Sequence, residues 1–281
     1  MSKGNNFIER SIMGALSFLK EAVFADEYAM RKGFLQSIDP RIKTVSFFLL
    51  LIQILFTQDI LVLCCLYAAC LLLAYCSRIG LGFFLKRTWI FIPLFSLFIA
   101  IPAVFSFFTP GEVLFSFDAA GWRLAVTRQG VDGAVLFVTR VVTSVSFAVL
   151  LSLTTKNFEL LKVLRVLGIP QIFVMTLGMC YRYIFLFMGT IENTYMAVKS
   201  RVGTSVHYKK GQHIVAWNIA SLWQRSYRFN EEVYNAMLSR GYSGEPVILN
   251  DFKTRARDWA WLCFAAGVFV LLWYLRRKAG V

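Results

Sequence analysis

Two stretches of the chain repeat one polar pattern, E-x-x-Y-x-A-x-x-S-R, at residues 192–201 and 231–240. Within this pattern the alanine and the arginine are four residues apart, so on a helix they lie on the same face. The small side chain lets a partner approach closely, and the planar guanidinium beyond it suits bidentate contact with carboxylates. The chemistry expected here is therefore recognition of an acidic surface. The residues that this geometry brings to one face are Ala197 and Arg201 in the first copy, and Ala236 and Arg240 in the second.

Helix capping is the simpler interpretation of either copy alone. Arginine suits the negative end of the helix dipole, and glycine commonly ends a helix in the left-handed conformation. Gly203 and Gly241 lie where such a cap is expected. Two matching copies, each at the end of a predicted helix, favour instead two equivalent contacts with a partner that has twofold symmetry.

Catalytic motifs are absent from the sequence, which contains no HExxH, GxSxG or GxxxxGK[ST] pattern. His207 and His213 share one polar turn, but two ligands without neighbouring cysteines or carboxylates make a weak metal site. The six cysteines form no CxxC pair, and four of them lie in one apolar run, which is typical of small buried residues. We therefore expect no enzyme activity, no metal site and no cofactor bound by this chain.

The composition is that of a membrane protein. Of the 281 residues, 58% are hydrophobic and 16% aromatic, whereas only 16% are charged, which is well below the share in soluble domains. A net charge of +14 is compatible with nucleic-acid binding, but basic residues also gather on the cytoplasmic side of membrane proteins. Because the composition is so apolar, we expect a lipid bilayer and no nucleic acid as partner. The expected fold is an all-α integral membrane protein with about five spans and a cytoplasmic helical domain.

Four of these spans are expected in residues 44–153. The first two form a tight helical hairpin broken at "TQD", the third covers Trp89–Phe108, and the fourth covers Val131–Leu153. Since a span needs around 20 helical residues, the first is long enough only if Arg41 and Lys43 snorkel outward.

The segments between the spans follow the positive-inside tendency. Residues 1–43 are expected in the cytoplasm, with an amphipathic helix in 11–35 and no cleavable signal, and the basic loop 77–88 returns to the same side. Residues 109–130 carry balanced charge, as an external loop should. Arg140 lies inside the fourth span, where an arginine either pairs with a neighbouring helix or contacts a second membrane subunit.

Residues 154–257 carry fourteen Lys and Arg against six Asp and Glu, which predicts a cytoplasmic helical domain even though 170–188 is apolar enough to span. One helix should end at the Gly168–Pro170 stop, and two longer helices, over about 171–201 and 214–240, should end in the repeated pattern. Residues 258–281 hold a last span and a basic tail, "RRKAGV". Five spans would place the C-terminus outside, whereas a basic tail favours the cytoplasmic side. The side of the C-terminus therefore stays open.

The chain resembles the transmembrane T component of energy-coupling factor (ECF) transporters, in particular the cobalt-type branch called CbiQ. The resemblance lies in "DPRIK" ahead of the first span, in "LGIPQIFVMTLGMCYRYIFLFMGTIE", and in the two arginine patterns, of which "AMLSRGYSGEP" is the most specific. The chain departs from the family in having serine before each arginine and Val202 where the first motif often has glycine.

This resemblance implies a non-catalytic subunit of an ATP-driven importer. The arginine-tipped helices would dock into grooves on two ATP-binding-cassette ATPases, or on the two copies of a homodimer, and these partners would hold the ATP. The docking residues that the resemblance implies are Ala197, Ser200, Arg201 and Val202 in the first copy, and Ala236, Ser239, Arg240 and Gly241 in the second. The membrane helices would hold a separate substrate-binding S component, in a bacterial or archaeal inner membrane with the coupling domain in the cytoplasm. Cobalt is the implied cargo, with nickel or a vitamin as alternatives. The alternative function is a stand-alone secondary transporter, or a membrane scaffold without an ATPase.

Overall fold

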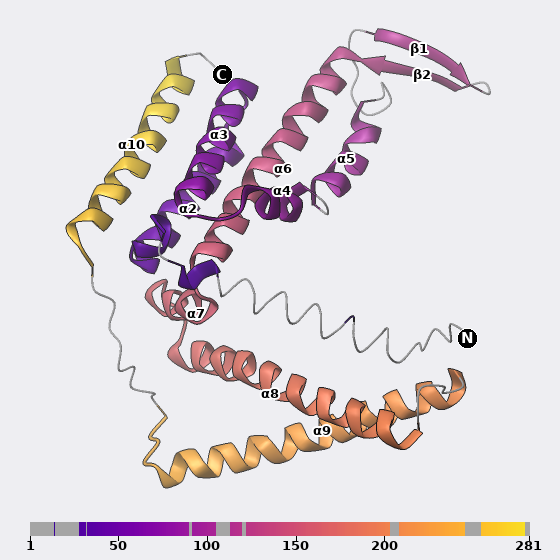
Figure 1. Ribbon diagram of the computed structural model, residues 1–281. Helices are drawn as coiled ribbons and strands as arrows, with labels where there is room; N and C mark the ends of the chain where they lie inside the picture. The colour runs from indigo at the N-terminus through magenta and orange to yellow at the C-terminus, as the bar shows by residue number, and fades with distance from the viewer. Residues whose placement is uncertain are drawn as a thin grey trace. The chain divides into compact units, whose positions relative to one another are not determined.

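The computed structural model describes residues 28–31, 33–89, 92–104, 113–119, 122–202, 208–244 and 254–278, together with Gly14. Contacts divide the chain into two compact units (Figure 1). The membrane unit contains Asp26–Leu160 and Phe252–Val281, and the helical unit contains Leu161–Asp251. Helices make up most of the described chain, which confirms the predicted all-α membrane class. Most of the amphipathic helix expected in residues 11–35 lies outside the described residues.

The break between the first two long helices lies where the sequence predicts, but the first helix starts before the predicted boundary at residue 44. After a short η1 turn (Leu35–Ser37), α2 (Pro40–Phe56) is capped by Asp39, whose side chain accepts a hydrogen bond from the Arg41 backbone N–H. α3 (Ile60–Cys76) follows the break at "TQD". The two helices make few contacts with one another, and each packs instead against a later helix, α6 (Arg128–Thr154). The expectation of a tight hairpin was therefore wrong, because α6 supplies the surface on which both helices are buried.

The region of the predicted second loop differs from expectation. Residues predicted as a basic loop form a helix, α4 (Leu81–Trp89), whose Phe84 and Thr88 side chains are buried. Trp89 is the last described residue of α4, and α5 covers Ile92–Ala103. Residues 90–91 and 105–108 of the predicted third span lie outside the described residues, so its bounds stay a prediction. α4 packs on α6 and α5, and this tertiary packing stabilises a helix that could not be predicted from a short basic segment alone.

A β-hairpin separates α5 from α6 within the segment predicted as an external loop. β1 (Val113–Ala119) pairs antiparallel with β2 (Trp122–Thr127), with Asp118 opposite Arg123 in the register. Thr127 ends the hairpin and caps α6, because its side-chain oxygen accepts a hydrogen bond from the Gly130 backbone N–H at 3.2 Å. The hairpin is a small addition to the helical class.

α6 is the central helix of the membrane unit. It packs against α2, α3, α4 and α5, while α10 (Ala256–Lys278) packs against α2 (Figure 1). The contact between α2 and α6 includes Phe47 and Phe147, whose rings are nearly perpendicular with centroids 5.8 Å apart. Both side chains are buried, so the core of the unit follows the length of α6.

Three described helices are long and apolar enough to cross a membrane, judged by length and composition. They are α6, residues Gln171–Val198 of α8 (Gln171–Val202), and residues Ala256–Tyr274 of α10. α6 and α10 contain the fourth and last predicted spans, whereas α3 is apolar but shorter. α8 was assigned to the cytoplasm from the charges around it, and that assignment stays a prediction, as do the domain boundaries at residues 44, 154 and 258.

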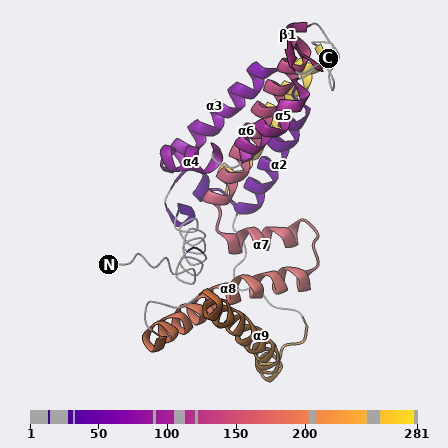
Figure 2. The ribbon, with the colours of Figure 1, turned by 90° about the vertical axis from the view of Figure 1, so that its right-hand side faces the viewer.

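The remaining helices follow the predicted order: α7 (Asn157–Val166), then α8 and α9 (Tyr208–Ser239), which carry the repeated pattern. α7 ends at Gly168, which has a φ of 91°, and the Ile169 N–H bonds the Leu164 carbonyl across this turn. The helix stop predicted there is confirmed. α8 continues past Arg201 to Val202, and α9 ends at Ser239, one residue before Arg240. Figure 2 shows the two long helices from a second side.

Candidate docking site at two helix ends

The two copies of the pattern occupy equivalent places on α8 and α9. Ala197, Ser200, Arg201 and Val202 belong to the last turns of α8, and Val202 is its final residue. Ala236 and Ser239 belong to the last turn of α9, while Arg240 and Gly241 form the turn that follows. Each arginine therefore lies at the C-terminus of a helix of 32 residues.

The serine before each arginine bonds back to its own helix. The Ser200 hydroxyl donates to the Met196 carbonyl at 2.8 Å, and the Ser239 hydroxyl donates to the Asn235 carbonyl at 2.9 Å. In both copies the acceptor lies four residues before the serine, so the hydroxyl donates a hydrogen bond to a backbone carbonyl of the last turns of its own helix. The two helix ends thus share a local geometry as well as a sequence.

The end of α9 has the left-handed glycine cap that the sequence predicted. Gly241 has a φ of 82°, its N–H bonds the Leu238 carbonyl, and the Tyr242 N–H bonds the Met237 carbonyl. This pair of bonds is the Schellman arrangement, which satisfies carbonyls that the helix itself leaves open. The corresponding residue after α8, Gly203, lies outside the described residues, so the cap of the first copy is not compared.

Both arginines and the small residues beside them are exposed. Arg201, Arg240, Ala197 and Ala236 all have exposed side chains. Within the part of the chain that the structure describes, neither arginine takes part in an ion pair or a side-chain hydrogen bond. Each guanidinium thus keeps its donors available for a carboxylate on another protein.

The two arginines lie at opposite ends of α8. The Tyr242 hydroxyl donates to the Met175 sulfur at 3.2 Å, which places the end of α9 beside the first turns of α8. Arg201 is at the other end of α8, and the rise of 1.5 Å per residue puts roughly 39 Å between Met175 and Arg201. The two helices cross (Figure 1), and the ring centroids of Phe187 on α8 and Phe229 on α9 are 6.1 Å apart.

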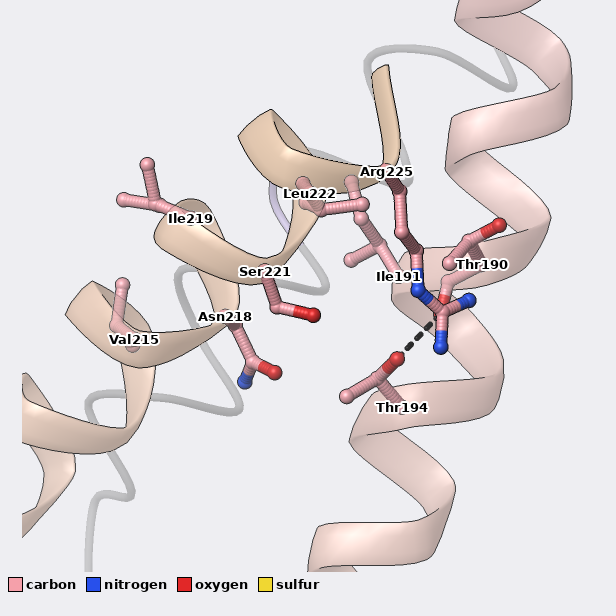
Figure 3. Close-up of a pocket in the computed structure, with 9 residues that line it drawn as sticks. All are labelled: Thr190, Ile191, Thr194, Val215, Asn218, Ile219, Ser221, Leu222 and Arg225. Atoms are coloured by element: carbon pink, nitrogen blue, oxygen red, sulfur yellow. Dashed lines mark hydrogen bonds between the residues drawn. The ribbon is translucent and has the colours of Figure 1, made fainter. Parts of the chain in front are cut away.

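A pocket lies between α8 and α9 near this crossing (Figure 3). Its volume is about 120 Å³, and most of its surface is apolar. The Thr194 hydroxyl donates to the Thr190 carbonyl at 2.7 Å, so it is already satisfied within α8. The lining residues are Thr190, Ile191, Thr194, Val215, Asn218, Ile219, Ser221, Leu222 and Arg225. None of these lining residues is an Asp, Glu or His, so the pocket offers space between two helices without an acid–base pair among its lining residues.

Metal ligands do not gather in groups of three or more His, Cys, Asp or Glu among the described residues. His213 is exposed on α9, and His207 lies outside the described residues, so their proximity in the predicted turn is not measured.

Arg140, the candidate for contact with a membrane partner, has a partner inside the chain. Its guanidinium donates to the Thr57 carbonyl at 2.7 Å, where α2 ends. This is the pairing with a neighbouring helix that the sequence left as one alternative. A contact with a second subunit stays a prediction.

Sequence reasoning missed a group of buried polar residues. The first predicted span was long enough only if Lys43 snorkelled outward, but its side chain is 1% exposed and Asp258 is buried with it in the membrane unit. That condition is not met, because Lys43 finds acceptors inside the protein, with its ammonium within 3.0 Å of two carbonyls. The signal that could have found this residue is "DPRIK", a polar motif at the start of the apolar helix α2.

Comparison with known proteins supports the resemblance. An uncharacterized protein of Methanocaldococcus jannaschii is 34% identical over 268 residues, which cover 95% of this chain and 91% of that protein. A second uncharacterized protein of the same organism is 25% identical over 228 residues, covering 78% and 81%. The energy-coupling factor transporter transmembrane protein EcfT of Streptococcus thermophilus is 26% identical over 251 residues, covering 84% and 89%. Residues 31–249 match the family CbiQ, described as cobalt transport protein. This match covers most of the chain, which therefore belongs to the CbiQ cobalt transport protein family.

Proposed function

We propose that this chain is the coupling T subunit of an ECF-type importer, which passes the movement of two ATPase subunits to a substrate-binding S component. The observation that carries the proposal is the pair of exposed arginines at opposite ends of α8, each following a serine bonded back to its helix. Two equivalent tips fit a partner with two equivalent sockets, and a dimer of ATPases has that symmetry.

The separation of the tips supports two sockets on different subunits. A distance of roughly 39 Å between Met175, beside the end of α9, and Arg201 is comparable to the width of a small domain. A single acidic groove cannot contact both tips at once. Two grooves, one on each ATPase, can each contact one tip. When ATP brings the two ATPases together, α8 and α9 would move with them, and no chemistry would take place in this chain.

Cobalt is the cargo we propose, because it is named in the description of the family. The importer would lie in the inner membrane with the helical unit in the cytoplasm, where the ATPases have access to ATP. The S component would carry the substrate site, which fits the lack of metal-ligand groups among the described residues here.

The docking assignment is tested by reversing both charges, in Arg201→Glu with Arg240→Glu. A desolvated arginine in a socket is worth about 2–5 kcal/mol on truncation, so the double variant should insert in the membrane but lose its ATPases in a detergent pull-down. The control is Arg165→Glu with Arg228→Glu, which changes the same charge at two other exposed sites of the helical unit. Retention of the ATPases by the first variant, at the level of the control, would contradict the assignment.

A stand-alone transporter is the second candidate, and one observation favours it. α8 is long and apolar enough to span, so the region assigned to the cytoplasm has the composition of a further membrane helix. Purified chain in liposomes separates the two functions. Cobalt uptake without added ATPases would support the stand-alone transporter, whereas uptake that requires both ATPases and ATP would support coupling.

A further inference from the structure

Four buried polar residues meet inside the membrane unit, and we name them the junction cluster: Asp39, Lys43, Thr154 and Asp258. None has a side chain more than 5% exposed. They come from the start of α2, the end of α6 and the start of α10, which are far apart in the sequence. Polar groups buried to this extent are costly unless their hydrogen bonds are made within the protein.

Lys43 joins two of these elements through one ammonium group. Its Nζ donates to the Thr154 carbonyl at 2.9 Å and to the Leu35 carbonyl at 3.0 Å. Thr154 is the last residue of α6, where carbonyls have no partner within the helix. Leu35 belongs to the η1 turn before α2. Lys43 therefore fixes the end of α6 against the segment that starts α2.

Asp258 joins the third element to the same place. Its carboxylate accepts hydrogen bonds from the Arg255 backbone N–H at 2.8 Å and from the Asp39 backbone N–H at 3.3 Å. The first bond caps the start of α10, and the second ties that start to the first residue before α2. A further buried bond, from the Trp261 indole N–H to the Ser46 hydroxyl at 2.9 Å, holds the next turns of α10 and α2 together.

The chain leaves and re-enters the membrane unit at these residues. Thr154 immediately precedes the segment that leads through α7 into the helical unit, whose residues begin at Leu161. Asp258 follows the segment that returns from the helical unit, whose residues end at Asp251. These two connections, the one after Thr154 and the one before Asp258, are thus anchored by hydrogen bonds to the same short stretch, Leu35–Lys43.

We propose that Lys43 is a positioning residue for coupling, which holds the membrane ends of both connections so that a displacement of the helical unit reaches α6 and α10 together. The inference rests on the coupling function proposed above. Without Lys43 the end of α6 has an unpaired carbonyl and can shift on its own. Movement of the helical unit would then be absorbed in the connection instead of being passed on.

The test is Lys43→Met in the complete complex with its ATPases and S component, reconstituted in liposomes. Methionine keeps much of the volume of lysine and removes both hydrogen bonds. We expect the ATPases to be retained and ATP hydrolysis to continue, while cobalt transported per ATP falls about tenfold. Lys86→Met is the matched control, because Lys86 is an exposed lysine of the same unit. The amount of cobalt transported per ATP separates a positioning role from a structural role, because a misfolded chain loses ATPase retention, ATP hydrolysis and transport together.

Hydrogen exchange of the complex supplies a second measurement. Lys43→Met should speed exchange at the end of α6 and the start of α7 and leave α9 unchanged, and Asp258→Asn should speed exchange at the start of α10. Unchanged exchange at these sites, or a wild-type transport ratio in Lys43→Met, would overturn the inference. So would exchange raised throughout the chain in both variants. If the wild-type complex shows no ATP-dependent transport at all, it is the coupling function itself that has failed.

Discussion

The basic residues Lys43, Arg140, Arg201 and Arg240 differ in how far they are buried and in which groups accept their hydrogen bonds. Lys43 is buried and donates to two carbonyls, Arg140 is half-buried and donates to one, and Arg201 and Arg240 are exposed without an ion-pair partner among the described residues. A donor that is satisfied internally stabilises the chain, whereas an exposed arginine keeps its bidentate fork for another protein. The location of each group, more than its charge, decides which role it has.

Arg140→Met tests this distinction. Removing the guanidinium leaves the Thr57 carbonyl without its 2.7 Å donor, and an unpaired buried carbonyl costs about 1–3 kcal/mol. We expect Arg140→Met to lower the melting temperature of the isolated chain in detergent. Arg128→Met, which replaces an exposed arginine at the start of the same helix, should leave the melting temperature unchanged. If the isolated chain keeps its stability and the S component no longer co-purifies, Arg140 is a partner contact instead.

At the residue scale the sequence predicted more about the exposed sites than about the buried ones. The repeated pattern identified Arg201 and Arg240 because two copies at helix ends carry information that one copy lacks. Lys43 was misread because its acceptors, the carbonyls of Leu35 and Thr154, are backbone groups, and one of them is more than a hundred residues away. No pattern of side chains in the sequence identifies which backbone carbonyl will accept a hydrogen bond.

Helix ends are the elements on which the docking site depends. α9 stops because Gly241 adopts a positive φ of 82°, and the Schellman bonds of Gly241 and Tyr242 then fix the turn that holds Arg240. A residue with a β-carbon resists that conformation, so the direction of the chain after Arg240 depends on glycine. The tip is therefore positioned by backbone geometry and not by packing.

Gly241→Ala should disturb the tip through this geometry. Alanine in the left-handed conformation costs about 1–2 kcal/mol, so the last turn should fray and the ATPases should be held more weakly. Gly189→Ala is the control, because Gly189 lies inside α8 with open space around its Cα, where alanine is the better helix former. Weaker ATPase retention in Gly241→Ala alone is expected. Equal retention in both variants would show that the cap is not needed for docking.

At the element scale, the long helices and α7 were predicted, whereas α4 and the β-hairpin were not. α8 and α9 carry helical periodicity over many turns, and glycine stops mark the ends of α7 and α9, so local signals were enough. α4 forms because Phe84 and Thr88 are buried by neighbouring helices, which is a tertiary effect. The hairpin did leave a signal, since "VLFSFDAAGWRLAVT" alternates apolar and polar residues about a turn, but its balanced charge was read as a loop.

On the scale of the whole molecule, the side of the membrane on which α8 lies decides between the two functions. The helix satisfies the length and composition of a span, yet the residues around it carry the basic excess of a cytoplasmic domain. If α8 spans, Arg201 lies on the opposite side from the end of α6. If it does not, the tip of α8 is on the same side as that end, where ATP is available to the partner.

Cysteine labelling can settle this in a variant whose six native cysteines are replaced by serine. Single cysteines would replace Lys156, just after α6, Ser200, at the tip of α8, and Asp132, near the start of α6; all three positions are exposed. Because α6 is long enough to cross the bilayer, Lys156→Cys and Asp132→Cys should react with an impermeant maleimide from opposite sides. We expect Ser200→Cys to react from the same side as Lys156→Cys. Reaction of Ser200→Cys from the side of Asp132→Cys would make α8 a span, placing Arg201 away from any cytoplasmic ATPase.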